Sequence, residues 1–513
     1  MSTSVICILL TIGVYLIGML VVGFRFAKEN ESAADFYLGG RKLGPLVTAM
    51  SAEASDMSSY LLMGLPGLAY LSGVADVGWT AIGLALGPYL NWLLVAKRIR
   101  RYTHMTDSFT LPQFFSNRFR DEKHILSTVA ALMIVVFFVP YTASGFAACG
   151  KLFHSLFGAD YMVTMIISAI VIVGYTAAGG FLAASTTDFI QSIIMTFALL
   201  FVLGYATISA GGIGAVAENA KGLAGYLSFT STHVADGNTA APYSLFTIVS
   251  TLAWGLGYFG MPHILLRFMA IEDEEKLSLS RRVASIWVTI AMAIAVCIGI
   301  VGNALTKQGM VPELTGSNTE TIIIQIANVL ASHGIFPALM AGLVLAGILA
   351  STMSTADSQL LAAASSVSQN ILQEALHKKM SQKTSMLAAR LTVIGIAILG
   401  VIIARDPSSS IFGIVSFAWA GFGAAFGPLV LCSLFWKRTN FQGALAGMIA
   451  GGVSVFVWKY GVAPMGGVLA VYELLPAFLI GLVVLVVVSL LTKAPSEEIV
   501  KEYEAMEASL KKR

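Results

Sequence analysis

Long apolar runs separated by short polar connections dominate the hydropathy pattern of this 513-residue chain. The runs hold about 20 residues each, which is the length that an α-helix needs to cross a bilayer. The pattern therefore predicts an all-α polytopic membrane protein with no room for a large soluble domain. We expect thirteen spans, at residues 4–24, 46–71, 77–96, 125–150, 161–182, 189–208, 243–265, 283–304, 336–370, 389–404, 411–436, 441–461 and 474–492.

The second predicted span is interrupted by polar residues in the stretch AMSAEASDMSSYLLMGLP (49–66). Asp56 would lie near the middle of the membrane, where an ionised carboxylate is costly unless it lines a cavity or has a partner. Ser, Asp and the following Gly-Leu-Pro-Gly also weaken a continuous helix. We interpret the stretch as a broken helix whose freed backbone groups and hydroxyls bind a small cation. A kinked structural helix with a hydrogen-bonded carboxyl is the alternative.

The seventh predicted span is interrupted as well, in SLFTIVSTLAWGLGYFGMPHILLRF, by Gly255, Gly257, Gly260 and Pro262. The three glycines match G-x-G-x-x-G, but they lie inside a membrane span without a βαβ context, so a dinucleotide site is rejected. Spans 2–6 and spans 7–11 form two groups of five that each open with an interrupted helix. This is typical of inverted-repeat transporters, which bind their substrate at the two breaks.

The chain then divides into six parts. They are an extra N-terminal span with its loop (1–45), the first repeat (46–208), an outer loop (209–242), the second repeat (243–436), two C-terminal spans (437–493) and a charged tail (494–513) that we expect to be a solvated end.

The ninth predicted span carries hydroxyl residues on one helical face, because Ser351, Ser354, Thr355 and Ser358 recur at intervals of one to four residues. Small hydroxyl residues on one face also support tight helix packing, so that interpretation stays open. Packed against a broken helix with free carbonyls, the same face supplies the hard oxygen ligands that sodium prefers.

Further carboxylates accompany Asp56 at or near membrane depth. Asp357 follows Ser354 on the ninth span, and Asp188 lies at the predicted end of a span. Asp188 is either part of a cation pathway or a helix cap. Glu53 is either the partner of a basic residue or a group that faces water.

Composition and charge placement support this picture, since 57% of the residues are hydrophobic and only 12% are charged. The 31 Lys and Arg residues divide 26 to 5 between the two alternating sets of connections. Because positive charge accumulates in cytoplasmic loops, the N-terminus is expected outside and the C-terminus in the cytoplasm. The four cysteines show no metal spacing. No Walker A motif, nucleophile elbow or HExxH appears, so we expect neither an enzyme nor a nucleic-acid partner.

Several long motifs are recognisable, and the chain resembles proline-transporting bacterial members of the sodium/solute symporter family. The resemblance runs from about residue 10 to KAPS (493–496). It implies a LeuT-like fold of five-plus-five inverted repeats in the bacterial inner membrane. The motifs are FYLGGRKLGP (36–45), SDMSSYLLMGLPG (55–67), GWTAIGLALG (78–87), GFLAASTTDFIQ (180–191), WGLGYFGMPHILLRFMA (254–270), MSTADSQLL (353–361) and AWAGFGAAFGP (418–428).

Positions carried over from the family imply a sodium site and residues that couple sodium to transport. The sodium ligands implied are the carbonyls of Ala54 and Met57, the carbonyl of Ser351, and the hydroxyls of Ser354 and Thr355. The coupling or cation-pathway positions are Asp56, Asp188, Asp357 and Arg41.

The resemblance also implies a proline pocket, formed by Ser58, Tyr60, Tyr141, Trp254, Tyr258 and Pro262. Aromatic faces suit a compact pyrrolidine ring and attract its ammonium group. Lipid-facing aromatics are the alternative for Trp254 and Tyr258. The chain departs from a familiar member of the family at four positions. Tyr60 stands where that member has Trp, and Ser351 stands where it has Ala. Glu53 replaces a small residue, and Asp357 replaces a serine.

The function implied is uptake of L-proline driven by inward sodium movement, with sodium as the co-transported ion. A symporter of another small solute (another amino acid, pantothenate or a monocarboxylate) is the main alternative. A sensor that has lost transport is the second. The oligomeric state is not determined by the sequence.

Overall fold

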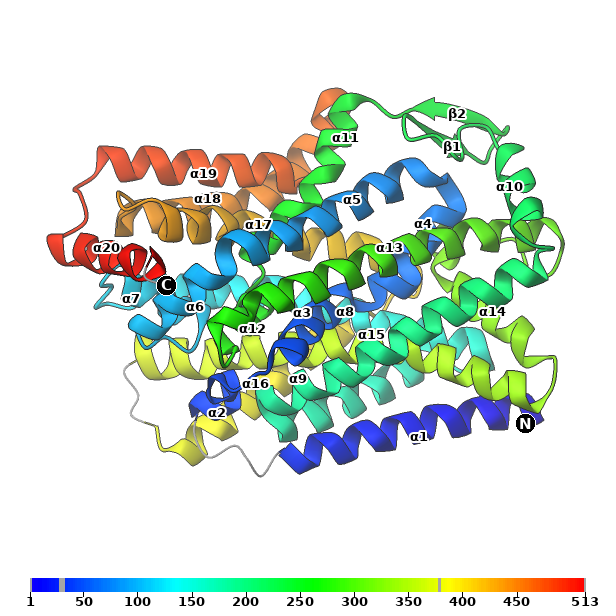
Figure 1. The fold of residues 1–513 in the computed structure, drawn as a ribbon, viewed down its shortest axis with the longest axis horizontal. Helices are drawn as coiled ribbons and strands as arrows, with labels where there is room; N and C mark the ends of the chain where they lie inside the picture. The colour runs from blue at the N-terminus through cyan, green and yellow to red at the C-terminus, as the bar shows by residue number, and fades with distance from the viewer. Residues whose placement is uncertain (1, 27–32, 377–379, 512–513) are drawn as a thin grey trace.

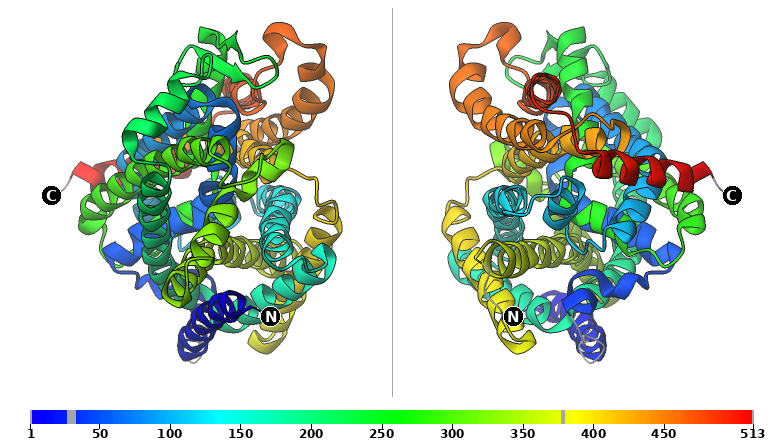
Figure 2. Two further views of the ribbon diagram at one scale, coloured as in Figure 1. Left: turned by 90° about the vertical axis from the view of Figure 1, so that its right-hand side faces the viewer. Right: turned by 90° about the vertical axis from the view of Figure 1, so that its left-hand side faces the viewer.

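Long helices run side by side from one end of the molecule to the other in the computed structural model, which describes residues 2–26, 33–376 and 380–511 (Figure 1). The N-terminus lies at one end of this bundle, and the C-terminal helix lies at the opposite end. Viewed along the helices, α1 lies at one edge and α18 and α19 lie at the other (Figure 2). Five basic residues that entered the charge count lie outside the described ranges: Lys28, Lys378, Lys379, Lys512 and Arg513.

The first half of the chain contains α1 (Thr3–Phe26), α2 (Ala33–Leu38), η2 (Gly39–Arg41), α3 (Pro45–Ser59), η3 (Tyr60–Gly64), α4 (Leu65–Ser72), α5 (Val74–Leu90), η4 (Asn91–Val95), α6 (Ala96–Met105), α7 (Leu111–Arg118), α8 (Ile125–Phe157), α9 (Tyr161–Ser209), α10 (Ile213–Lys221), β1 (Ser231–Val234) and β2 (Thr239–Pro242).

The second half contains α11 (Leu245–Leu252), η5 (Ala253–Gly260), α12 (Pro262–Ala270), η6 (Glu274–Lys276), α13 (Leu277–Lys307), η7 (Gly316–Thr321), α14 (Ile322–Ala331), α15 (Ile335–Ser365), η8 (Ser366–Ala375), α16 (Gln382–Ile403), α17 (Ile411–Phe435), α18 (Phe441–Val457), η9 (Trp458–Val462), η10 (Ala463–Met465), η11 (Gly467–Leu469), α19 (Leu474–Leu491) and α20 (Glu497–Lys511).

Ten helices in the described part of the chain are long and apolar enough to cross a membrane, and the bent pair α11–α12 raises the number to eleven. Two predicted spans are not among them. The span at 46–71 is divided among α3, η3 and α4, and it carries Glu53 and Asp56. The span at 161–182 appears as a shorter apolar stretch, Tyr161–Gly174. The number thirteen therefore stays a prediction.

The fifth and sixth predicted spans are joined in the single helix α9, where we had expected a connection at 183–188. The direction changes earlier, at Gly180, whose φ of 67° and ψ of −170° interrupt the helix. A positive φ is readily adopted by glycine and is uncommon for other residues, which is why the break falls on this residue.

The two predicted breaks appear in the helices that carry them. In α3, Ser58 leaves helical geometry with φ 49° and ψ −170°, and π-helical η3 follows. In the seventh span, the 3₁₀ segment η5 and the extended residue Met261 separate α11 from α12, with a bend of 48°. Both breaks are buried in the bundle, and α15 is packed against α3.

The outer loop at 209–242 is more ordered than its Gly- and Ser-rich sequence suggested. It holds α10 and an antiparallel hairpin in which Ser231 pairs with Pro242. This hairpin is the one β-sheet in the described residues, which also contain an isolated bridge between Leu43 and Ile271. It lies at the end of the bundle opposite α20 (Figure 1).

The prediction of a solvated tail is wrong, because α20 is docked on the body of the protein. Its apolar face buries Ile499, Tyr503 and Met506. Its acidic face pairs with the basic end of the bundle, where Arg120 lies 2.6 Å from Glu502 and Lys437 lies 3.0 Å from Glu504. The tail sequence carries only a weak amphipathic signal for this docking, because these three apolar residues, spaced three to four positions apart, lie in a strongly charged stretch.

A Tyr503→Ala substitution tests this docking. Removing a buried side chain of this size costs roughly 1.5–3 kcal/mol. We therefore expect the α20 amides to exchange hydrogen roughly tenfold to a hundredfold faster. Hydrogen–deuterium exchange with mass spectrometry measures the rate, and the exposed-site variant Glu498→Ala serves as the matched control. Equal exchange in the two variants would show that Tyr503 does not anchor the tail.

Candidate functional site

The break in α3 meets the hydroxyl face of α15. Beside the break, the carbonyl of Ala54 accepts a hydrogen bond of 2.9 Å from the Ser354 hydroxyl. Both residues are fully buried. Ser58 has a backbone conformation that a non-glycine residue rarely adopts, and such strain persists only where the surrounding structure holds it in place. Carbonyl and hydroxyl oxygens from two helices therefore converge at the strained point of α3.

The other predicted sodium ligands surround this contact. The carbonyl of Ser351 accepts hydrogen bonds from both Thr355, at 3.1 Å, and Ser354, at 3.3 Å. The carbonyl of Met57 accepts a hydrogen bond from the backbone N–H of Tyr60. The structure thus joins Ala54, Ser351, Ser354 and Thr355 in one chain of contacts, whereas Met57 is engaged within its own segment.

A small cavity of about 10 Å³ lies between the two breaks. Four of the six predicted proline-pocket residues line it, and so does Asp56. Ser58 and Pro262 do not line it: Ser58 accepts a hydrogen bond from Tyr60, and Pro262 begins α12. The full lining is Asp56, Met57, Tyr60, Leu84, Tyr141, Trp254, Tyr258, Met292, Val415 and Trp419.

Asp56 is held by two tyrosines from other helices. The Tyr258 hydroxyl donates to the Asp56 carboxylate in a short contact, and the Tyr141 hydroxyl donates to the Asp56 backbone carbonyl at 3.1 Å. Tyr258 lies in η5 and Tyr141 lies in α8, so this one residue connects three segments. The alternative in which Tyr258 and Trp254 face lipid is wrong, because their exposed fractions are 0% and 4%.

Stacked aromatic rings form one wall of the cavity. The rings of Tyr60 and Trp254 stack with centroids 5.6 Å apart, and Phe412 packs against both. Trp419 donates from its indole N–H to the Trp254 carbonyl at 2.8 Å. A Cβ at Gly257 would collide with the Trp419 indole, which is why η5 needs glycine there. We did not predict Trp419, although it lies in the motif AWAGFGAAFGP.

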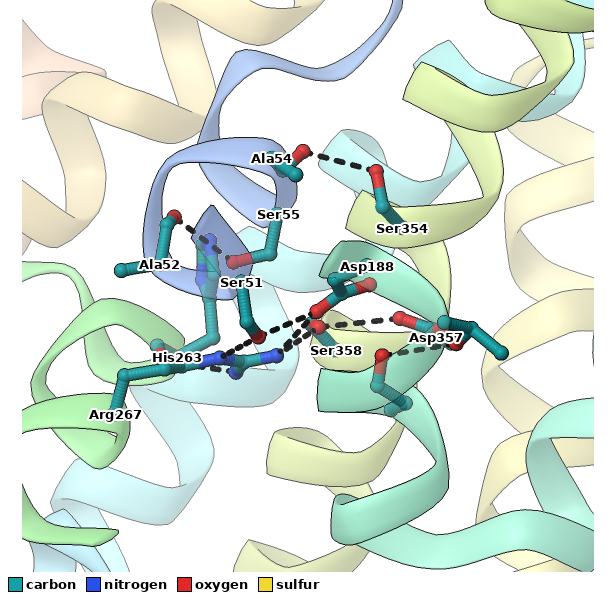
Figure 3. A network of polar contacts seen from close by, with 12 residues as sticks. Ser51, Ala52, Ala54, Ser55, Asp188, His263, Arg267, Ser354, Asp357 and Ser358 are labelled. Atoms are coloured by element: carbon teal, nitrogen blue, oxygen red, sulfur yellow. Dashed lines mark hydrogen bonds and ion pairs between the residues drawn. The ribbon is translucent and has the colours of Figure 1, made fainter. Parts of the chain in front are cut away.

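A second buried network lies on the other side of the α3–α15 contact (Figure 3). The Arg267 guanidinium lies 3.1 Å from the Asp188 carboxylate, and the exposed fractions of these side chains are 1% and 0%. Ser51 donates to Asp188 at 2.7 Å and accepts from Arg267 at 3.0 Å. Ser358 accepts from Arg267 and donates to Asp357 at 3.1 Å. Four segments, α3, α9, α12 and α15, therefore meet at one arginine.

This network corrects the interpretation of Asp188 as a possible helix cap. Asp188 lies within α9, eight residues after the break at Gly180, and it is completely buried. We did not predict Arg267 or Ser51. An arginine inside the apolar stretch HILLRF is a visible signal in the sequence, because a charged residue in a membrane span usually has a partner.

Glu53 follows neither of its two predicted alternatives. It is 1% exposed, so it does not face water, and it accepts a hydrogen bond of 2.9 Å from the Trp92 indole. Its other carboxylate oxygen has no hydrogen-bond partner among the described residues.

Arg41 lies outside the membrane-spanning helices, at the end of η2 and ahead of α3. Its guanidinium donates to the Met269 carbonyl at 2.7 Å and to the Ser108 carbonyl at 2.8 Å. Arg41 therefore connects η2 to the end of α12 and to the loop between α6 and α7. Burial and the nearby Arg100 lower the pKa of Arg41 to about 10, and the group stays cationic at neutral pH.

The groups at the α3–α15 contact and in the neighbouring cavity are suited to binding an ion and a small solute. Among the described residues, no three His, Cys, Asp or Glu side chains gather as a transition-metal site would require. The oxygens at the α3–α15 contact are hard, mostly uncharged donors, which suit an alkali cation. The neighbouring cavity offers aromatic faces and one carboxylate, which suit a small solute with an ammonium group.

Sequence comparisons place these features among known transporters. The model of the sodium:solute symporter family matches residues 36–451. The sodium/proline symporter of Escherichia coli is 41% identical over 504 residues, which cover 98% of this chain and 96% of the relative. The osmoregulated proline transporter OpuE of Bacillus subtilis is 40% identical over 509 residues, which cover 99% of this chain and 99% of the relative.

Comparison with solved structures supports the predicted LeuT-like fold. A Na⁺-coupled sialic acid symporter superposes with a TM-score of 0.78 at 18% identity, covering 96% of this chain and 99% of that protein. The transporter Mhp1 of the nucleobase-cation-symport-1 family superposes with a TM-score of 0.56 at 14% identity, covering 93% and 99%. At these identities the likeness shows the shared fold.

The buried ion pair predicts a non-additive effect on stability. Arg267→Met leaves the Asp188 carboxylate buried without its cation, which costs about 3–5 kcal/mol. We expect a clearly lower melting temperature in detergent for this variant. The double variant Arg267→Met/Asp188→Leu removes both charges and should regain most of the loss. A double variant that melts no higher than the single one would contradict the pairing.

Proposed function

This chain belongs to the sodium:solute symporter family, and we propose that it couples inward sodium movement to the uptake of L-proline. The observation that carries the proposal is the contact between the broken helix α3 and the hydroxyl face of α15, directly beside an aromatic cavity. The near full-length identity to sodium/proline symporters supports the choice of solute.

The proposed topology has thirteen spans, with the N-terminus outside and the C-terminus in the cytoplasm, in a multi-pass protein of the bacterial inner membrane. Arg267 was counted among the 26 but is buried in α12, which leaves a division of 25 to 5 that still supports this orientation. The position of the two termini at opposite ends of the bundle fits an odd number of spans. Spans 2–6 (46–208) and spans 7–11 (243–436) form the two inverted repeats, and each repeat opens with one of the two breaks.

Sodium is proposed to bind between α3 and α15. Its ligands are the carbonyls of Ala54, Met57 and Ser351 and the hydroxyls of Ser354 and Thr355. Because Ser354 already contacts the Ala54 carbonyl, an entering ion would replace that hydrogen bond with two ion–oxygen contacts. The ion would thereby fix the distance between α3 and α15.

Proline is proposed to bind in the cavity between the two breaks. Tyr60, Tyr141, Trp254 and Tyr258 would surround its ring, with Ser58 and Pro262 at the ends of the interrupted segments. The cavity of about 10 Å³ has room for about one water molecule, so binding of proline requires these side chains to move apart. Asp56 connects the two sites, since it lines the cavity and lies two residues after Ala54.

The proposed transport cycle depends on the closeness of the sodium and proline sites. Sodium orders the α3 break, proline binds beside it, and the loaded protein opens to the cytoplasm by movement of one repeat against the other. Asp188, Asp357 and Arg41 are proposed to lie along the cation pathway or to couple it to this movement. One inward charge is worth about 2.3 kcal/mol per 100 mV, which supports roughly a fifty-fold solute gradient.

Uptake of labelled L-proline into proteoliposomes tests the proposal. We expect uptake with an inward sodium gradient and little uptake with potassium in its place. Asp56→Asn removes the negative charge and keeps an oxygen that can still accept the Tyr258 hydrogen bond. A hydrogen bond to a charged group is worth about 1 kcal/mol more than one between neutral groups, so we expect uptake to fall by roughly fivefold or more.

Asp236→Asn, in the exposed outer hairpin, is the matched control and should transport normally. Sodium-driven uptake of another amino acid, pantothenate or a monocarboxylate, without proline uptake, would overturn the choice of solute. A lack of sodium-driven uptake of any of these solutes would overturn the assignment as a symporter and favour a sensor.

A further inference from the structure

A groove on the lipid-facing side of the molecule separates two helices that run antiparallel. Its cavity volume is about 520 Å³. One wall comes from the part of α9 before Gly180, and the other wall comes from α16. Isoleucine and valine at spacings of three and four residues form most of both walls, principally Ile166, Ile170, Val173, Ile394, Ile398 and Ile402.

The protein does not fill this groove. Gly174 lines it, and a Cβ built at Gly174 would have no heavy atom within 4 Å. Small residues at such a seam usually let two membrane helices pack closely, yet here the space stays open. Ile170 is 65% exposed and Ile398 is 57% exposed, so the walls face the acyl chains of the bilayer.

One end of the groove is cationic. Arg390 donates from Nε to the Ala177 carbonyl at 3.3 Å, which places its guanidinium where α9 and α16 come together beyond the apolar walls. A second hollow of about 360 Å³ begins there, and Lys383, Met386, Leu387 and Arg390 line it. On α16, positions 383, 387, 390, 394 and 398 recur every three to four residues, so the cationic end and the apolar wall share one helical face.

These two cations differ from many others at the same end of the bundle. Lys97, Arg98, Arg120 and Lys437 pair with acidic side chains. In the part of the chain that the structure describes, neither Lys383 nor Arg390 lies in an ion pair, and the remaining guanidinium nitrogens of Arg390 have no hydrogen-bond acceptor. The charge is thus available to an external anion at the level of a lipid head group.

We propose that this groove binds an anionic phospholipid of the cytoplasmic leaflet. An acyl chain lies between α9 and α16, and the phosphate lies against Arg390 and Lys383. Guanidinium groups bind phosphate in a bidentate manner, and basic pockets between membrane helices are suited to anionic head groups. The leaflet follows from the topology proposed above. Because α9 belongs to the first repeat and α16 to the second, the lipid would bridge the two repeats.

Native mass spectrometry of the purified full-length protein tests the proposal, with dioleoylphosphatidylglycerol and dioleoylphosphatidylcholine as probes. Two cationic contacts predict roughly a thirtyfold preference for the anionic lipid. The double variant Lys383→Gln/Arg390→Gln should lose this preference. Gly174→Leu, which fills the groove and leaves the charge unchanged, should also lose it. The measurement needs no transport, so it is independent of the outcome of the uptake experiment.

Matched controls separate a built site from general surface charge. Arg25→Gln/Arg282→Gln removes two exposed cations from the same end of the bundle, and Gly18→Leu adds the same side chain at an open position of α1. Both controls should keep the preference. If the Arg25/Arg282 variant loses it as fully as the Lys383/Arg390 variant, diffuse charge explains the binding. If Gly174→Leu keeps it, the groove is not the site. Either result overturns the proposal.

Discussion

The constraint on which the rest of the structure depends is that the bilayer core offers no water to an interrupted helix. Every freed backbone group must find a partner inside the protein. The breaks at Ser58 and Met261 are therefore tolerated only because other helices surround them. Ser354 is the partner for the first break, because its hydroxyl donates a hydrogen bond to the Ala54 carbonyl. The same carbonyl and hydroxyl are two of the oxygens that we propose as sodium ligands.

Charge placement follows from the same constraint. In the described chain, the buried carboxylates next to the α3–α15 contact are held mainly by hydroxyl groups and by the one cation Arg267. The Asp56 carboxylate accepts a hydrogen bond from the Tyr258 hydroxyl, and the Tyr141 hydroxyl donates to the Asp56 backbone carbonyl. An interior that holds more carboxylates than cations favours the entry of a positive charge, and the sodium ion proposed to bind at the α3–α15 contact would supply it.

The features predicted from sequence were those that depend on local pattern. Span positions follow from runs of apolar residues, and the breaks follow from Ser58 and from the glycines of η5, because each is encoded within a few residues. The local pattern suggested that the broken second span packs against the hydroxyl face of the ninth, whereas the choice of Ala54 and Ser354 came from the resemblance to the family; the structure brings these two residues into contact.

Features that depend on contacts between distant segments were missed. The pairing of Arg267 with Asp188 joins residues 79 positions apart, and no local pattern relates them. The burial of Tyr503 depends on Arg118 of α7 and Leu434 of α17, so the tail sequence alone suggested a solvated end. Trp419 enters the cavity only because Gly257 lets α17 approach η5. Long-range packing, which an isolated stretch does not encode, decided each of these cases.

The central claim is that sodium and proline bind to one structural unit, and equilibrium binding measures this directly. Labelled L-proline would be titrated onto the purified protein at a series of sodium concentrations. The account predicts that sodium tightens proline binding and that proline tightens sodium binding by the same factor. Ser354→Ala should abolish both effects while leaving the fold intact. Proline binding of equal affinity with and without sodium would contradict the account.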